Sequence, residues 1–323
     1  MDSQAVQAIL SNYGYWIVLE VGKGAFSTCY HVVDEKYNRD FICKVLEIPK
    51  DYEQALLVKK SYYNEVNALV ECIHPNVIKI YKCFIEKNYH FIILEYCNHG
   101  SIYDLILQKG PLKEQDLFKY TLEFANGLSY CHSMGIANHD VKPANLLLGE
   151  FNKLKIADFG FASLQKYLTS EFMGSLAFMS PEKISGFEYN PFLSDVWSFG
   201  ISLYYMATAN LPFYGLNTVN LKRSILGCTY QIPNSVPIFA KTIIMKTLVL
   251  KPADRWTMSE VIKYMRSLQG KYISRNKSAS ELVIKTFTSA RLNKRCSATR
   301  LSCDSLLVSN DQDTINEEDY VLS

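Results

Sequence analysis

The chain has 323 residues, a hydrophobic content of 48%, a formal net charge of +2 and nine cysteines. This hydrophobic content is ample for a packed core, and the near balance of charges gives no reason to expect a nucleic-acid or membrane partner. The N-terminus lacks a basic region ahead of a long apolar run, and no stretch approaches the roughly 18 apolar residues of a spanning helix. The cysteines are scattered without a C-x-x-C pair, so we expect buried, reduced thiols and a cytoplasmic protein that also has access to the nucleus.

A strand, a glycine-bearing turn and a returning strand are predicted over residues 15–33. The turn and the positions beside it are Val21, Gly22, Lys23, Gly24, Ala25, Phe26, Ser27 and Cys29. Glycines let a backbone approach a polyphosphate closely and offer its N–H groups to it. Because a strand follows rather than a helix, the turn is not a dinucleotide-binding fingerprint, and on its own it is equally an ordinary hairpin turn.

The following strand, residues 41–46, carries Lys44 inside an apolar run. A lysine there is usually an edge residue whose ammonium group reaches solvent. A helix is predicted over residues 53–72, and it contains Glu65. The apolar face predicted for this helix consists of Leu56, Leu57, Val66, Leu69 and Val70.

Two further strands are predicted over residues 77–84 and 90–95, and they lead into Glu95 and Cys97. Helical patterns then dominate, over residues 101–108 and 112–134. The predicted buried face of the longer helix is Leu117, Tyr120, Thr121, Phe124, Leu128 and Cys131. A strand-rich first third followed by helices indicates an α+β fold with a β-rich and an α-rich lobe.

The stretch Asn138–Asn145 and the triplet Asp158-Phe159-Gly160 carry the densest chemistry in the sequence. Two short strands, at 146–148 and 154–157, are predicted between them. Transfer of a phosphoryl group from ATP needs a carboxylate near the attacking hydroxyl, a cation near the phosphate and oxygen ligands for Mg²⁺. The residues of the right type for these parts are Asp140, Lys142, Asn145 and Asp158.

In order and spacing, these motifs resemble those of eukaryotic-type protein kinases over residues 15–268. In its overall sequence character the chain is similar to the calmodulin-dependent and Polo-like groups, and no subfamily is assigned. The resemblance implies a two-lobed kinase fold, with an N-lobe at 15–97 and a C-lobe at 98–268. It also implies ATP and Mg²⁺ as ligands and proteins as substrates, and Lys142 has the position typical of serine/threonine kinases.

The resemblance assigns a role to each candidate residue. Lys44, paired with Glu65, would hold the α- and β-phosphates, and Asp140 would accept the proton of the substrate hydroxyl. Lys142 would offset charge on the γ-phosphate. The metal ligands would be Asn145 and Asp158; the ATP site would be the glycine turn with Cys29, Lys44, Glu95 and Cys97. The activation segment would include Thr169, Ser170, Ser175 and Glu182, with Arg255 as the partner of Glu182.

The sequence departs from the kinase pattern just before the catalytic aspartate, where Asn138 and His139 replace histidine and arginine. Because that arginine grips a phosphorylated activation loop in the family, its loss predicts little dependence on phosphorylation. The departure also leaves open a pseudokinase that binds nucleotide and acts as a scaffold or regulator. Lys44 and the two aspartates, Asp140 and Asp158, remain, which favours an active enzyme.

Substrate preference can be predicted from three positions at which arginine-selective kinases resemble one another in carrying carboxylates. They align with Ser101, Ala144 and Tyr205, none of which is acidic, although Asp104 lies one helical turn beyond Ser101. Without such a carboxylate, strong selection of arginine is not expected.

The region 269–323 lacks the apolar periodicity of the preceding chain. Residues 271–300 are basic and rich in Ser and Thr, whereas 301–323 contain six acidic residues and no basic one. We predict a mostly disordered tail. Residues 281–295 could instead form a short basic helix of the calmodulin-target type, and a solvated linker is the favoured interpretation.

Overall fold

The computed structural model describes residues 2–24, 26–164 and 174–270. Its first compact unit is Met1–Gln269, and the second, Gly270–Ser323, lies almost entirely outside the described residues. The predictions for the tail, for Ala25 and for Thr169 and Ser170 therefore fall outside the described part of the chain.

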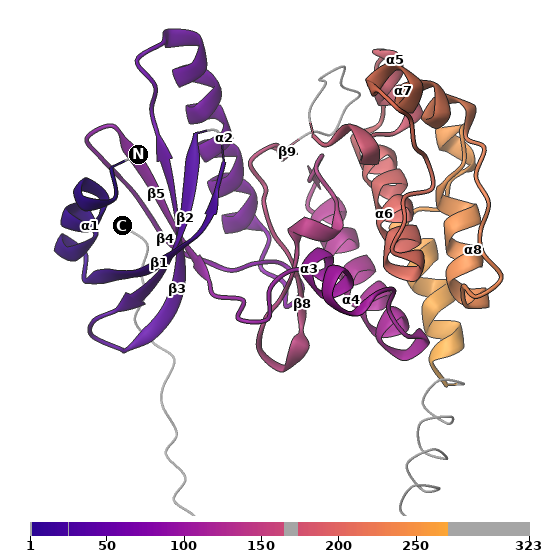
Figure 1. Ribbon diagram of the computed structural model, residues 1–323, viewed down its shortest axis with the longest axis horizontal. Coiled ribbons are helices and arrows are strands. Elements are labelled where there is room, and N and C mark those ends of the chain that lie inside the picture. The colour runs from indigo at the N-terminus through magenta and orange to yellow at the C-terminus, as the bar shows by residue number, and fades with distance from the viewer. Residues whose placement is uncertain (1, 25, 165–173, 271–323) are drawn as a thin grey trace, which may run out of the picture. The chain divides into compact units, whose positions relative to one another are not determined.

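An antiparallel sheet of five strands forms the N-terminal lobe, in the order β1-β2-β3-β5-β4 (Figure 1). The strands are β1 Tyr15–Lys23, β2 Ser27–Asp34, β3 Arg39–Glu47, β4 Ile80–Glu86 and β5 Tyr89–Glu95. The predicted strand-turn-strand unit and the strand around Lys44 are confirmed. The strand expected from residue 77 begins only at Ile80, because Val77 forms an isolated bridge with Ile156 instead.

Helix α2, Tyr52–Glu71, lies where the sequence predicts a helix, but the predicted buried face is wrong. Asp51 caps its N-terminus by accepting a hydrogen bond from the Gln54 N–H. The residues buried along it are Val58, Tyr62, Glu65, Ala68 and Leu69. Of the predicted apolar face only Leu69 is buried, whereas Leu56 and Leu57 are 57% and 65% exposed. The helix therefore turns a glutamate inward and two leucines toward solvent.

Helix α1, Ser3–Asn12, precedes the predicted start of the domain and was not expected from the sequence. The helix lies beside the sheet (Figure 1), and its Val6, Ile9 and Leu10 belong to the buried hydrophobic cluster that includes sheet residues. The Gln7 side chain accepts a hydrogen bond from the Ile17 N–H at 2.8 Å and thereby satisfies a donor on the edge strand β1. The folded unit therefore begins before residue 15.

Helices dominate the C-terminal lobe, as the sequence predicts. They are α3 Ile102–Lys109, α4 Glu114–Ser133, α5 Pro181–Ser185, α6 Pro191–Thr208, α7 Thr218–Gly227 and α8 Ile238–Thr247, followed by a helix at 258–270. All six residues predicted for the inner face of α4 are buried. The two-lobed α+β architecture is confirmed. No helix in the described ranges is both long and apolar enough to cross a membrane.

Short paired strands in the C-terminal lobe fix the loops that carry the candidate site residues. Strand β6, Ile136–Ala137, pairs with β9, Ser163–Leu164, and β7, Leu146–Leu148, pairs with β8, Leu154–Ile156. The stretch from Asn138 to Asn145 thus leaves one strand pair and enters the next, and Asp158 follows the second. This arrangement holds both acidic motifs by backbone pairing rather than leaving them on free loops.

The seven cysteines in the described ranges are all free thiols. Cys43, Cys72 and Cys131 are buried, as the sequence predicts for small apolar side chains. Cys83, on β4, is exposed, and the expectation of burial is wrong for this residue.

Candidate active site

Lys44 lies at the centre of a three-residue cluster that joins the two lobes. Its Nζ is 2.6 Å from Glu65 Oε2 and 3.1 Å from Asp158 Oδ1. Strand β3 supplies the lysine, α2 supplies the glutamate, and the segment after β8 supplies the aspartate. The Glu65 side chain is 1% exposed, whereas that of Asp158 is 39% exposed. The cluster is therefore closed at Glu65 and open toward solvent at Asp158.

The charges in this cluster support one another. Burial by itself would lower the pKa of Lys44, but the carboxylates of Glu65 and Asp158 outweigh it and raise that pKa above its usual value. The Lys44 ammonium in turn lowers the pKa of Asp158 despite the burial of that carboxyl. Burial raises the pKa of Glu65, and Lys44 opposes this effect. Lys44 and Asp158 are thus both charged at neutral pH.

A second cluster surrounds Asp140. Its Oδ2 is 2.6 Å from Lys142 Nζ, and its Oδ1 accepts the Ser175 N–H at 2.8 Å. Asn145 donates from Nδ2 to both the carbonyl and the Oδ2 of Asp140, at 2.9 and 3.2 Å. The Lys142 ammonium also donates to Ser175 Oγ at 2.8 Å. These contacts fix the carboxylate in one orientation at the end of the catalytic loop.

Gly174 explains how Ser175 comes so close to Asp140. Its φ is +95°, and a Cβ at this position would overlap the carbonyl oxygen of His139. Only glycine tolerates both conditions. The backbone can therefore pass directly over the catalytic loop and present the Ser175 N–H.

Of the residues predicted for the ATP site, Cys29 lies beside the first cluster. Cys29 pairs in register with Lys44 across β2 and β3, so it shares the lysine's side of the site. Burial raises the pKa of Cys29 to about 11 and that of Cys97 to about 12, so both thiols are neutral at pH 7. The Glu95 carboxylate is 2.7 Å from Lys155 Nζ, and the Glu95 N–H donates to the carbonyl of Lys79 at 2.9 Å.

Glu182, predicted at the end of the activation segment, lies in neither cluster. Its two carboxylate oxygens pair with Arg255 at 2.6 and 2.7 Å. This matches the predicted partnership and makes the pair an anchor for the segment rather than part of the chemistry. Of the two activation-segment candidates that the structure describes, Ser175 and Glu182, only Ser175 contacts Asp140.

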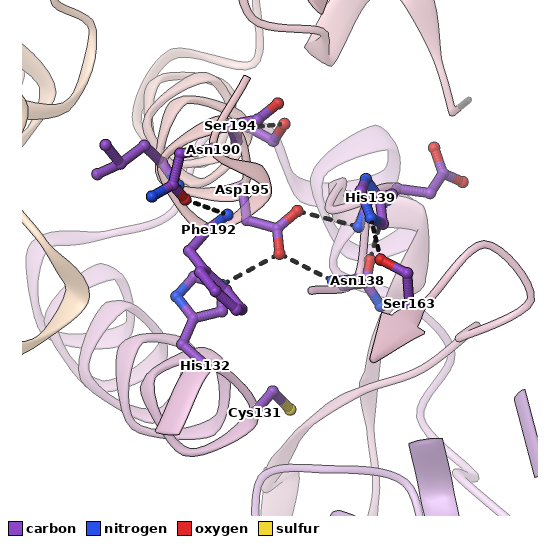
Figure 2. A network of polar contacts seen from close by, with 12 residues as sticks. Cys131, His132, Asn138, His139, Ser163, Asn190, Phe192, Ser194 and Asp195 are labelled. Atoms are coloured by element: carbon purple, nitrogen blue, oxygen red, sulfur yellow. Dashed lines mark hydrogen bonds and ion pairs between the residues drawn. The ribbon is translucent and has the colours of Figure 1, made fainter. Parts of the chain in front are cut away.

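A network beneath the catalytic loop was not foreseen from the sequence. Asp195, on α6, accepts hydrogen bonds from the N–H groups of Asn138 and His139 at 2.8 and 2.9 Å and contacts His132 Nε2 at 3.1 Å (Figure 2). The side chain of His139 contacts Ser163 Oγ at 2.7 Å. These partners are 24 to 63 residues apart along the chain, and no short motif links them.

Comparison with known proteins gives consistent matches. The family described as "Protein kinase domain" matches residues 15–265. Serine/threonine-protein kinase kin-29 of Caenorhabditis elegans is 30% identical over 87% of this chain and 34% of its own length. Probable serine/threonine-protein kinase KCC4 of Saccharomyces cerevisiae is 35% identical, over 65% of this chain and 21% of its own. Probable serine/threonine-protein kinase MARK-A of Dictyostelium discoideum is 32% identical, over 77% and 24%.

The matched regions of these relatives thus span about a third of their length or less. The family match, in contrast, covers most of the present chain and includes every residue of the two clusters described above. The chain belongs to the protein kinase domain family.

Proposed function

We propose that this chain transfers the γ-phosphoryl group of ATP, in the presence of Mg²⁺, to serine and threonine hydroxyls of protein substrates. One observation carries the proposal: Lys44 contacts Glu65 and Asp158 at the same time. That contact brings a phosphate-binding lysine, its helix partner and a candidate metal ligand into one site across the two lobes. The names of the relatives support the serine/threonine class.

Asn145 and Asp158 fit a magnesium ion by the chemistry of their oxygens. Asn145 uses its amide N–H group for Asp140, and its Oδ1 is the remaining ligand atom. Asp158 directs Oδ1 to Lys44, which leaves Oδ2 on a side chain that is 39% exposed. No group of three or more His, Cys, Asp or Glu suited to a metal occurs in the described residues. Mg²⁺ suits such a sparse set, because it keeps several waters and binds substrate phosphates.

Each protein group then has a separate role in the reaction. Asp140 orients the substrate hydroxyl and accepts its proton, and Lys142, whose Nζ is 2.6 Å from Asp140 Oδ2, supplies positive charge beside it. Lys44 positions the α- and β-phosphates, while Glu65 holds the lysine in place. Asn145 and Asp158 would hold the magnesium ion, which would supply positive charge beside the phosphates.

The pseudokinase alternative started from Asn138 and His139. In the structure, both residues hold the catalytic loop in place: their N–H groups bind Asp195, and His139 also contacts Ser163. We therefore favour catalysis over a scaffold without activity.

The decisive experiment measures phosphate transfer from radiolabelled ATP to the chain itself and to a protein substrate. Asp140→Asn, Lys44→Met and Asp158→Ala should each lower the rate by roughly 10²–10³-fold. Lys251→Met, a change at an exposed lysine, serves as the control and should leave the rate unchanged. Transfer that survives Asp158→Ala would rule out the proposed mechanism.

A further inference from the structure

Asn138 has a fully buried side chain whose two polar ends bind different parts of the candidate active site. Its Oδ1 accepts a hydrogen bond from the Asp140 N–H at 3.1 Å. Its Nδ2 donates to the carbonyl oxygen of Asp158, also at 3.1 Å. One amide group thus connects the backbone of the catalytic aspartate with that of the candidate metal ligand.

Both hydrogen bonds stabilise backbone in an unfavourable conformation. His139 has φ +67° and Asp158 has φ +58°, in the left-handed region that non-glycine residues rarely occupy. The contact from Asn138 Oδ1 to the Asp140 N–H closes a turn over His139. The contact from Nδ2 holds the carbonyl of Asp158 itself. Such conformations persist only where the surrounding structure fixes them.

The amide is also supported from below. The Asn138 N–H donates to Asp195 Oδ2 at 2.8 Å, and Asp195 is 1% exposed within helix α6. The buried helix therefore fixes the main chain from which the Asn138 side chain extends. Reorientation of the side chain would leave buried backbone groups of Asp140 and Asp158 without a partner, which is costly.

We propose that Asn138 is a positioning residue that sets the directions of the Asp140 and Asp158 carboxylates together. The inference rests on the proposed function, because Asp140 and Asp158 are taken as the base and a metal ligand. Asn138 does not touch the phosphates or the hydroxyl; it acts through the backbone of these two residues. Loss of its donor should therefore disturb metal binding and turnover more than nucleotide binding.

Two substitutions remove the amide N–H donor that binds the Asp158 carbonyl while keeping an acceptor oxygen for the Asp140 N–H. Asn138→Asp replaces the amide nitrogen by a carboxylate oxygen, and Asn138→Ser shortens the side chain without adding a buried charge. Asn210→Asp is the matched control, because Asn210 Nδ2 also donates to a backbone carbonyl, that of Thr208, but on an exposed loop. If the buried charge prevents Asn138→Asp from folding, Asn138→Ser still provides the test.

The first measurement is steady-state kinetics at varied Mg²⁺. For both Asn138 variants we expect kcat to fall about tenfold or more, KM for ATP to change less than about threefold, and the Mg²⁺ concentration for half-maximal rate to rise. Asn210→Asp should match the wild type. Variants that melt at lower temperature but keep wild-type kcat and Mg²⁺ dependence would make Asn138 merely structural and overturn the proposal.

The second measurement does not depend on catalysis. The melting temperature is recorded with a non-hydrolysable ATP analogue, with and without Mg²⁺, for each variant. The Mg²⁺-dependent part of the stabilisation should shrink in both Asn138 variants, while the part due to nucleotide alone stays. If the Mg²⁺-dependent rise in melting temperature is as large in the variants as in the wild type, the proposed role of Asn138 is wrong even if the enzyme is active. A wild type that binds Mg²⁺ and nucleotide but transfers no phosphate would refute the proposed function and leave this result to decide the role of Asn138.

Discussion

The guanidinium of Arg255 is fully buried against the carboxylate of Glu182, with Nη1–Oε1 and Nη2–Oε2 distances of 2.6 and 2.7 Å. Arg255 also donates to three backbone carbonyls, those of Leu193, Val249 and Leu250. The fork geometry of arginine makes these contacts possible from one side chain. The pair thereby ties the end of the activation segment to helix α6 and to the loop after α8.

Removal of Arg255 should strongly destabilise the fold. Arg255→Met leaves a largely buried carboxylate and three carbonyls without their donor, so we expect a loss of about 3–5 kcal/mol in the free energy of unfolding. Urea unfolding measures this loss, and Lys251→Met, at an exposed position, provides the control. A loss below about 1 kcal/mol, typical of an exposed ion pair, would contradict this account of the contact.

Helix α1 should contribute measurable stability to the N-terminal lobe. Leu10 is 0% exposed and packs in the hydrophobic cluster on the sheet, so Leu10→Ala should cost about 2–5 kcal/mol. Gln4→Ala, on the exposed face of the same helix, should change stability by less than about 0.5 kcal/mol. Equal effects of the two substitutions in urea unfolding would show that α1 is not part of the folded unit.

The sequence predicted the parts of this structure that depend on local patterns. Alternation and turn residues located strands β1, β2, β3 and β5, and the spacing of acidic motifs located Asp140 and Asp158. The buried face of α2 was predicted wrongly, because Leu56 and Leu57 are apolar but face solvent, whereas the charged Glu65 is buried by its pairing with Lys44. A hydrophobic pattern cannot foresee a buried ion pair.

Long-range partners that belong to none of the recognised kinase motifs could not be predicted for a similar reason. Asn138 binds Asp158 and Asp195, which are 20 and 57 residues away, and no periodicity relates these positions. Helix α1 was missed because it is only ten residues long and its core positions become apparent only against the finished sheet. In each case the tertiary contact, rather than the local sequence, decides the role of the residue.

Stability at acid pH should depend on Asp195. Burial alone would raise the pKa of Asp195, but hydrogen bonds from His132 and the Asn138 N–H outweigh it and lower that pKa below its usual value. A carboxyl with a lowered folded-state pKa stabilises the fold above its unfolded pKa of about 3.9, and this contribution is lost as the pH falls through the folded-state pKa. The stability gap between wild type and Asp195→Asn should therefore be largest near neutral pH and narrow below about pH 4.

Urea unfolding at pH 6.5 and at pH 3.5, the latter below about 3.9, measures this gap. Asp254→Asn, a change at an exposed aspartate, is the control and should give a small gap at both values. If the difference in unfolding free energy between wild type and Asp195→Asn stays constant or widens at acid pH, the predicted link between stability and the protonation of Asp195 is wrong.

Activity should depend little on phosphorylation of the activation segment. His139 occupies the position of the phosphate-gripping arginine of the family, and its side chain already contacts Ser163 Oγ at 2.7 Å. Histidine offers fewer N–H donors than arginine, and its charge depends on pH, whereas arginine is always positively charged. Thr169 and Ser170, which lie outside the described residues, are the candidate sites, and the double change Thr169→Ala with Ser170→Ala should keep most of the activity.

The comparison is made on initial rates, with wild type assayed before and after phosphatase treatment. Phosphatase should change the wild-type rate little, and the double variant should match it. A drop of more than about tenfold, equivalent to about 1.4 kcal/mol, in either sample would show that phosphate controls the loop.

The last prediction concerns substrate choice, and the structure adds the contacts of two residues to the argument. The three positions that would carry arginine-selecting carboxylates are Ser101, Ala144 and Tyr205. Asp104, one helical turn beyond Ser101, is already engaged. Its Oδ2 accepts from both the N–H and the Oγ of Ser101, at 3.0 and 2.7 Å, as part of the capping box of α3. Tyr205 stacks on Tyr103 with ring centroids 5.9 Å apart, which puts aromatic surface there instead of a carboxylate.

A charge-assisted, bidentate pair with arginine therefore has no carboxylate partner at these positions. We expect phosphorylation of serine or threonine in peptides without a strong requirement for arginine upstream of the acceptor. A positional peptide-library screen tests this, with Tyr205→Glu as the matched variant, because restoring a carboxylate should increase the preference for upstream arginine. A dominant arginine preference two or three residues before the acceptor in the wild type would refute the prediction, and labelling mainly on tyrosine would overturn the serine/threonine assignment as well.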